Sequence, residues 1–236
     1  MRPRFLALAA LGLLVPASAS AKIIEVGATK TPLVAPTCPS TLTPSQCTIV
    51  LTEVTAIETI RDGIAYPTKV THTGFISAFT LGLSRLDSNQ STARKDIRAL
   101  EKSYGGTPQA AIAVLRQTGN KRLRRYKVMA ESPAVQLLPY LGQVVQFPLS
   151  VALPVKRGDV IALSVPTWAP VLSINLPAKK FAYRQGRSSG CKTPSTKPLA
   201  QRPRQSARYE CDYTGTRVEY SATEITSPSP PKNYVH

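Results

Sequence analysis

Basic side chains are the most abundant groups in this chain that could bind a ligand. The sequence has 30 Lys and Arg against 13 Asp and Glu, which gives a formal net charge of +17. Two segments concentrate this charge, Lys121–Lys127 (K-R-L-R-R-Y-K) and Lys179–Arg208. A positive excess of this size attracts polyanions. The candidate contacts to an anionic wall polymer or acidic glycan are Lys121, Arg122, Arg124, Arg125 and Lys127.

The alternation of the first basic segment limits where it can lie. In an extended chain Arg122, Arg124 and Tyr126 share one face, while Leu123, Arg125 and Lys127 share the other. A fully buried strand does not carry arginine on both faces, so this segment is expected to project past the core or to lie at a sheet edge. Charged edges also block unwanted strand addition, and this alternative explanation of the charge stays open.

Trp168, the sole tryptophan, is the second candidate for contact with a glycan. It follows a strand pattern and precedes Pro170, and a rigid aromatic ring at a strand end can stack on a sugar. The apolar residues around it favour a buried position instead.

Nothing in the residue pattern indicates catalysis. The only histidines are His72 and His236, and no nucleophile elbow, phosphate-binding loop, dinucleotide fingerprint or zinc-protease motif occurs. A glycan hydrolase needs only two carboxylates, so it remains the least favoured alternative. The expected protein is non-catalytic, without cofactor or metal, and binds an anionic polymer; a purely structural surface or coat protein is the main alternative. No nucleic-acid-binding module is visible.

The first residues have the pattern of a secretory signal. Arg2 and Arg4 precede an apolar run over 5–15, and Ala19-Ser20-Ala21 supplies the small residues of a cleavage site. The predicted organisation is a signal peptide over 1–21, an irregular lead-in over 22–47, a sandwich domain over 48–226 and a disordered tail over 227–236. Secretion would leave a mature charge of +15, since the signal removes two arginines.

The four cysteines fit an exported chain. Export to an oxidising compartment favours two disulfides, for which three connectivities are possible. Local pairing, Cys38–Cys47 and Cys191–Cys211, is expected because each bridge would close a loop beside a strand. Without a C-x-x-C spacing, a zinc site has little support.

Two long alternating runs surround a polar turn and predict the centre of the fold. Val145, Phe147, Leu149, Val151 and Leu153 occupy every second position, as do Ile161, Leu163 and Val165. Residues 156–159 (K-R-G-D) separate the runs, so the pattern predicts a β-hairpin with Phe147 and Leu163 buried. Arg157-Gly158-Asp159 spells an adhesion tripeptide, although a turn needs glycine and polar flanks in any case.

Further strands are predicted over 48–54, 70–83, 111–116, 123–131, 171–176 and 217–225. Between them, Ser91 is a candidate N-cap of a short helix that has Ile97, Leu100 and Tyr104 on one face and ends at Gly105. Residues 179–208 are expected to form a long loop. Together these elements predict a single antiparallel, jelly-roll-like β-sandwich with one short covering helix and a long disulfide-closed loop.

Several of these segments also carry a resemblance. The runs E-S-P-A-V-Q-L-L-P-Y-L-G and V-K-R-G-D-V-I-A-L-S-V-P-T-W-A-P, with shorter matches at 74–79, 113–116, 209–213 and 220–223, resemble a group of uncharacterised secreted proteins of actinobacteria. The resemblance covers most of the mature chain. It implies a single β-sandwich and an extracellular location, and it implies no activity because none is established for the group.

Overall fold

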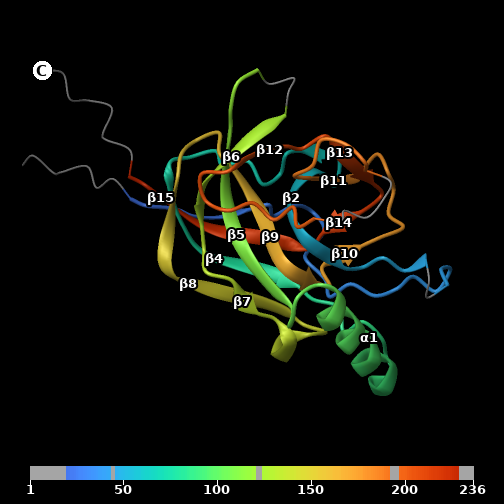
Figure 1. Ribbon diagram of the computed structural model, residues 1–236. Helices are drawn as coiled ribbons and strands as arrows, with labels where there is room; N and C mark the ends of the chain where they lie inside the picture. Colours follow the sequence, from blue (N-terminus) through green and yellow to red (C-terminus); the bar gives the residue numbers. More distant parts are fainter. Residues whose placement is uncertain (1–19, 44–45, 121–123, 192–196, 229–236) are drawn as a thin grey trace, which may run out of the picture.

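The computed structural model of the chain describes residues 20–43, 46–120, 124–191 and 197–228 (Figure 1). Within these ranges the chain forms an antiparallel β-sandwich with one α-helix at one end of the strands, which confirms the predicted fold class. The predicted signal peptide and C-terminal tail lie outside the described residues except for 20–21 and 227–228.

The smaller sheet has four strands in the order β1-β15-β4-β8, each antiparallel to its neighbours. Their bounds are Ile23–Val26 (β1), Tyr220–Thr226 (β15), Gly74–Gly82 (β4) and Val144–Val155 (β8). The lead-in was expected to be irregular, and that expectation is wrong for β1. Ile24 and Val26 turn towards the core, and the strand pairs with β15 from Ile23–Ile225 to Val26–Ala222.

The larger sheet has the order β12-β6-β5-β9-β2-β11-β13, with two short strands attached to its flanks. The bounds are Ser206–Arg208 (β12), Arg125–Glu131 (β6), Gln109–Gln117 (β5), Val160–Ala169 (β9), Leu51–Arg61 (β2), Phe181–Gln185 (β11) and Cys211–Thr214 (β13). β3 (Ile64–Ala65) pairs with β2, and β7 (Val135–Gln136) pairs with β5. A separate two-stranded ribbon joins β10 (Leu172–Ser173) to β14 (Arg217–Val218).

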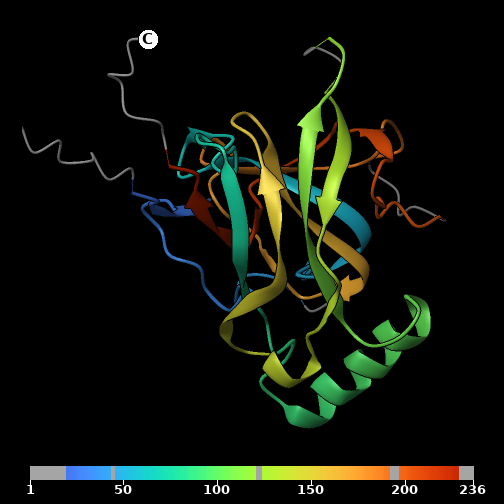
Figure 2. The same cartoon turned by 90° about the vertical axis from the view of Figure 1, so that its left-hand side faces the viewer.

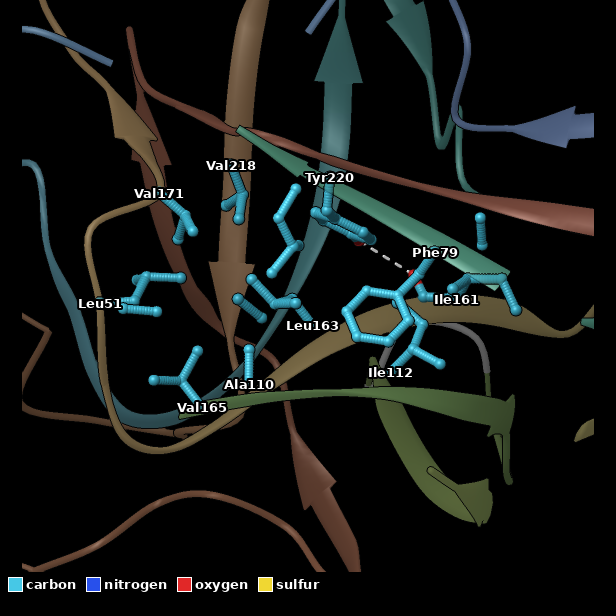
Figure 3. Packing of buried hydrophobic residues seen from close by; sticks show 14 of the residues in the cluster. Leu51, Phe79, Ala110, Ile112, Ile161, Leu163, Val165, Val171, Val218 and Tyr220 are labelled. Atoms are coloured by element: carbon cyan, nitrogen blue, oxygen red, sulfur yellow. Dashed lines mark hydrogen bonds between the residues drawn. The ribbon is translucent and has the colours of Figure 1, made fainter. Parts of the chain in front are cut away.

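The main hydrophobic core lies between the two sheets (Figure 3). Phe79 and Phe147 of the smaller sheet contribute to it, with ring centroids 5.3 Å apart, and both predicted core residues Phe147 and Leu163 are buried. Tyr220 is fully buried, and its hydroxyl donates a hydrogen bond of 2.9 Å to the Ile161 carbonyl. A buried phenol is tolerated here because its polar atom has a partner.

A second apolar cluster covers the outer face of the larger sheet. It contains Ile57, Leu115, Tyr126, Val128 and Tyr209 together with Ala113, Val160 and Ala162. β5 and β9 are therefore covered on both faces, which explains why β9 is buried continuously from Val160 to Val165.

The central hairpin predicted from the alternating runs is not formed. β8 pairs with β4 in the smaller sheet, whereas β9 pairs with β2 and β5 in the larger one, so residues 156–159 cross from one sheet to the other. Alternation indicates which face of a strand is buried and does not specify the neighbouring strand. The register of β4 and β8 also shifts between Ile76–Leu153 and Ala78–Pro148, which leaves Val151 exposed although its phase predicted burial.

Four other expectations about element boundaries differ from the structure. β2 continues to Arg61, seven residues past the predicted end at Val54. The strand predicted over 171–176 is limited to β10, and the predicted last strand is split into β14 and β15. The expected loop over 179–208 contains β11 and β12, so only its middle part is irregular.

The helix α1 (Gln90–Ser103) is present, but its cap is Asn89 and not Ser91. The Asn89 side chain accepts hydrogen bonds from the backbone N–H groups of Ser91 and Thr92, at 2.9 and 3.2 Å, which satisfies two donors of the first turn. None of its residues is fully buried. The helix therefore borders one end of the sandwich (Figure 1) without closing it, and the expectation of a covering helix is corrected to that extent. A short 3₁₀ helix, Leu138–Tyr140, lies between β7 and β8.

Both predicted disulfides, Cys38–Cys47 and Cys191–Cys211, are formed. The second closes the segment that contains β12 and joins it to the first residue of β13. No helix among the described residues is long and apolar enough to span a bilayer.

Candidate functional site

The two basic segments singled out in the sequence meet on neighbouring strands. β6 carries Arg125 and Lys127 from the first segment, and β12 carries Arg208 from the second. β12 pairs antiparallel with β6, so Arg208 lies directly opposite Arg125 and Ser206 lies opposite Lys127. On the other side of β6, Lys127 lies opposite Arg116 of β5.

Strand alternation places these basic residues on one face. Residues two apart in a strand point to the same side, and residues directly opposite in a ladder share that side. Arg125 and Lys127 therefore share a face with Arg116 and Arg208. We call these four residues the basic face; the exposed Arg124 directly precedes Arg125 in the chain.

On the opposite side of the same strands, two tyrosines form an aromatic anchor that holds β6 and β12 together. Tyr126 and Tyr209 are buried and pack edge to face, with ring centroids 5.3 Å apart and an interplanar angle of 80°. The Tyr209 hydroxyl donates to the Gln201 side-chain oxygen, and the Gln201 N–H donates to the Thr55 hydroxyl at 2.8 Å. Burial raises the pKa of both phenols, so neither contributes negative charge. This anchor holds β12 and β6 in place beneath the basic face.

Backbone hydrogen bonds extend this attachment beyond the three residues of β12. The Tyr209 N–H donates to the Arg124 carbonyl at 3.0 Å, and the Val128 N–H donates to the Gln205 carbonyl at 2.9 Å. The position of Arg208 relative to Arg125 is therefore set by a continuous ladder and not by a free loop.

Most of the positive charge on this face has no internal counter-charge. Arg116 is the exception: its Nε and Nη2 donate to the two oxygens of Asp159, each at 2.7 Å. Arg208 has only a 3.5 Å contact with Glu210, and both side chains are exposed, so this pair contributes little. Arg124, Arg125 and Lys127 have no carboxylate partner among the described residues.

The residues before and within β12 add to the positive electrostatic potential of the basic face. Residues 160–209 contain nine Lys or Arg and no Asp or Glu. Like charges directly opposite in an antiparallel ladder destabilise the pairing. An anion bound between the opposed Arg125 and Arg208 would therefore reduce their repulsion and stabilise the pairing of β6 with β12.

Three of the five predicted polymer contacts lie among the described residues. Arg124 and Arg125 are exposed and Lys127 is half-buried, whereas Lys121 and Arg122 lie outside the described residues. β12 covers the outer edge of β6, so β6 is not an edge strand; the β5–β6 hairpin instead projects beyond the other strands (Figure 2). Sequence reasoning missed Arg116, and it noticed Arg208 only as one charge in a long basic segment.

The stacking interpretation of Trp168 is wrong. The indole is fully buried, and its Nε1 donates a hydrogen bond of 2.9 Å to the Gly106 carbonyl. Trp168 instead joins β9 to the segment that follows α1, and neither face of its ring is open to a sugar.

Asp159 similarly removes the adhesion interpretation of the Arg157-Gly158-Asp159 turn. Its side chain is buried, binds Arg116 and accepts from the Lys156 N–H at 2.9 Å. This carboxylate fixes the crossover between the sheets and is not available to a receptor.

A group of ion pairs lies inside the protein. Glu58 and Glu219 are fully buried and pair with the buried Arg61 and Arg217, at 3.4 and 3.3 Å. Burial raises the pKa of Glu58 to about 7, against the opposing effect of Arg61. Because solvent and substrate have no access to fully buried carboxylates, this quartet does not form a hydrolytic site; we call it the buried ion quartet.

The buried ion quartet binds the N-terminal segment to the sandwich. Arg61 donates to the Gly27 carbonyl at 2.6 Å, and Arg217 donates to the carbonyls of Thr31 and Pro32 at 3.1 and 3.0 Å. Glu219 accepts from the Val34 N–H at 3.3 Å. Its role is structural.

A surface groove of about 800 Å³ lies beside both disulfides, lined by Leu100 and Tyr104 of α1 and by the stacked pair Tyr183 and Tyr213. Its lining includes Gln46, Cys191 and Lys197, which are the last or first described residues beside gaps in the described ranges, and we assign no site to it. Across the described ranges, no three His, Cys, Asp or Glu side chains are grouped as metal ligands.

Comparison of the chain with known proteins found no matching family, no similar characterised protein and no similar solved structure.

Proposed function

We propose that this protein is a secreted, non-catalytic protein that binds an anionic polymer, such as an acidic wall polymer or extracellular polysaccharide, through the basic face. The observation that carries the proposal is the cross-strand opposition of Arg125 and Arg208, two exposed cations from segments far apart in the sequence. Repulsion between them is relieved by a bound carboxylate, sulfate or phosphate group.

The chemistry of the residues supports this choice of ligand. Guanidinium groups present several N–H donors in a plane, which suits recognition of oxyanions. Anchoring by Tyr126 and Tyr209 supports binding because it reduces the ordering that the strands undergo when the polymer arrives. Two disulfides and the absence of a membrane-spanning helix among the described residues are compatible with an extracellular location.

A structural coat protein is the competing function, and it explains the same charges differently. β12 is the terminal strand of the larger sheet and carries Arg208, and charged edge strands resist strand addition by other molecules. On this explanation the arginines keep the protein soluble and bind nothing.

The test compares two variants with the same change in charge. Arg125→Gln/Arg208→Gln alters the basic face, and Arg94→Gln/Arg98→Gln alters exposed arginines of α1 at the other end of the molecule. The probes are polygalacturonate and dextran sulfate, with neutral dextran as the control. Binding by the first variant is expected to weaken roughly tenfold or more, since hydrogen bonds to charged groups contribute about 1.5–3 kcal/mol each.

Wild-type binding is also expected to weaken steeply with salt, because exposed charges are screened over about 8–10 Å near physiological ionic strength. Equal losses in the two variants would mean that only net charge matters and would contradict a localised site. Unchanged binding in the first variant, with increased light scattering, would favour edge protection over polymer binding.

A further inference from the structure

A row of exposed apolar side chains crosses the outer face of the smaller sheet. Ile23 of β1 lies opposite Ile225 of β15, Ile225 lies opposite Phe75 of β4, and Phe75 lies opposite Pro154 of β8. Ile23 is 76 % exposed, Phe75 47 % and Ile225 39 %. Four directly opposed residues on four neighbouring strands form one continuous stripe, which we call the apolar stripe.

These side chains are exposed although the strands that carry them alternate normally between the core and the outer face. The residues next to the apolar stripe, among them Ile24, Ile76 and Leu153, turn inward and belong to the core. The following row on the outer face is polar, because Glu25 accepts hydrogen bonds from Ser221 and Thr223. The apolar stripe is therefore bounded by a polar row on β1 and β15, and contiguous apolar patches of this kind mark interaction surfaces.

Cations flank the apolar stripe. Lys22 precedes Ile23, and its backbone N–H donates to the Thr226 hydroxyl at 2.9 Å, next to Ile225. Lys156 and Arg157 follow Pro154, and the Arg157 N–H lies 3.5 Å from the hydroxyl of Thr73, two residues before Phe75. All three cationic side chains are exposed. The acid of this turn, Asp159, is buried against Arg116 and does not offset them.

The apolar stripe lies at a defined end of the molecule. The connection from β8 to β9 and the β5–β6 hairpin are at the same end, opposite to α1 (Figure 2). A surface that approached this end would meet the apolar stripe together with the cations that flank it.

We propose that the apolar stripe and its flanking cations dock onto an anionic lipid surface. Phe75, Ile23 and Ile225 enter the boundary between headgroups and acyl chains, while Lys22, Lys156 and Arg157 bind lipid phosphates. Peripheral membrane binding combines these two contributions, burial of apolar side chains and attraction of cations to anionic headgroups.

Charge and size favour a lipid over a second copy of the chain. A symmetric dimer across the apolar stripe would bring Lys22, Lys156 and Arg157 of both copies together. Glu25, the carboxylate of the adjacent row, already accepts hydrogen bonds from Ser221 and Thr223 and does not balance three cations. A stable protein interface also engages roughly 20–30 residues on each side, many more than this stripe supplies. Anionic headgroups supply the missing negative charge.

The experiment is co-sedimentation with vesicles of phosphatidylcholine and phosphatidylglycerol in equal parts, compared with phosphatidylcholine alone. The test variant is Phe75→Ser/Ile225→Thr. The matched control is Val144→Thr, because Val144 is also 47 % exposed and lies at the other end of the same sheet. The affinity of the test variant for the mixed vesicles is expected to fall at least roughly tenfold, because the variant loses apolar surface that the lipid would bury. The control is expected to bind like the wild type.

A second readout does not depend on a loss of binding. The chain has one tryptophan, Trp168, which is fully buried. In the Phe75→Trp variant the new indole starts exposed, so its emission should shift to shorter wavelength when mixed vesicles are added. Wild-type emission should stay constant.

Three results would overturn the proposal: no binding of the wild type to mixed vesicles, equal binding to both vesicle types, or undiminished binding by Phe75→Ser/Ile225→Thr. A wild-type dimer that this variant converts to a monomer would also overturn it and would assign the apolar stripe to a second copy. The proposal does not rest on polymer binding, because dextran sulfate binding should be the same in this variant as in the wild type.

Discussion

Two pairs of arginines in this protein have opposite environments. Arg61 and Arg217 are fully or almost fully buried, each paired with a buried glutamate and donating to backbone carbonyls. Arg125 and Arg208 are exposed, directly opposed to each other, and have at most one weak carboxylate contact. The same residue type thus holds the chain together in one region and presents unpaired charge in the other.

The difference shows that net charge alone is a poor guide to function. A buried guanidinium must be paired because removing a charge from water costs several kcal/mol, so its hydrogen-bonding capacity is used within the fold. An exposed guanidinium retains its hydration and remains able to exchange water for a ligand. Only the second pair belongs to the charge that a polymer can reach.

The largest expected effect comes from breaking the buried pair. Arg61→Met should lower the free energy of unfolding by about 3–5 kcal/mol, since Glu58 would be left buried without its partner. Arg125→Met, the matched exposed change, should alter it by less than about 0.5 kcal/mol. Denaturant unfolding of both variants measures the contrast, and similar values would show that the two regions do not differ as described.

A compensating change sharpens this result. The double variant Glu58→Leu/Arg61→Met should recover much of the stability that Arg61→Met loses, because no unpaired charge remains in the core. Recovery would attribute the loss to the isolated carboxylate, whereas an equally unstable double variant would attribute it to the contacts of Arg61 with Gly27, Val218 and Tyr220.

The pH dependence of stability should include a contribution from the buried ion quartet. Burial raises the pKa of Glu58 from 4.5 to about 7, so the native state binds more protons than the unfolded chain between these values. The contribution of this group is therefore fully present below about pH 4.5 and is lost as the pH rises through about 7, by up to about 3 kcal/mol. Unfolding curves of wild type and Glu58→Gln across this range test the prediction. The decline should be smaller in the variant, and what remains comes from Glu131, Glu219 and Glu224, whose pKa values burial also raises.

Removal of either disulfide should lower stability, but only one of the two removals should weaken polymer binding. Cys191→Ser/Cys211→Ser should lower the free energy of unfolding by about 3 kcal/mol in the chain-entropy model and should also weaken dextran sulfate binding, because this bridge closes the segment that carries Arg208. Cys38→Ser/Cys47→Ser should destabilise by a similar amount and leave binding unchanged. Thermal unfolding and binding are measured on both; equal binding by both would mean that the bridge does not position β12.

The smallest effect is expected at the basic face itself. Arg125→Gln/Arg208→Gln removes two like charges that lie opposite each other, so it should raise stability by about 0.2–0.5 kcal/mol at low salt. Added salt should abolish this gain by screening the repulsion in the wild type. A clear loss of stability would show that these arginines contribute to the fold, and would weaken the contrast with Arg61 and Arg217.

Local pattern was sufficient to predict several features of this protein. The alternating runs predicted an antiparallel β-sandwich and the burial of Phe147 and Leu163, and the cysteine spacing predicted both disulfides. Helical spacing of Ile97, Leu100 and Tyr104 predicted α1 to within a few residues. Each of these properties depends on residues close together in the chain, where backbone geometry relates spacing directly to structure.

Tertiary structure alone decided which strands are neighbours and therefore which charges meet. A period of two residues indicates which face of a strand is buried but does not specify the neighbouring strand. For this reason β8 and β9 were predicted to pair, although they lie in different sheets. For the same reason the sequence did not reveal that Arg208 lies opposite Arg125, or that Arg61 and Arg217 meet Glu58 and Glu219 inside the protein. Whether an arginine binds a ligand or holds the fold depends on the desolvation imposed by residues distant in the sequence, and only the folded chain brings those residues together.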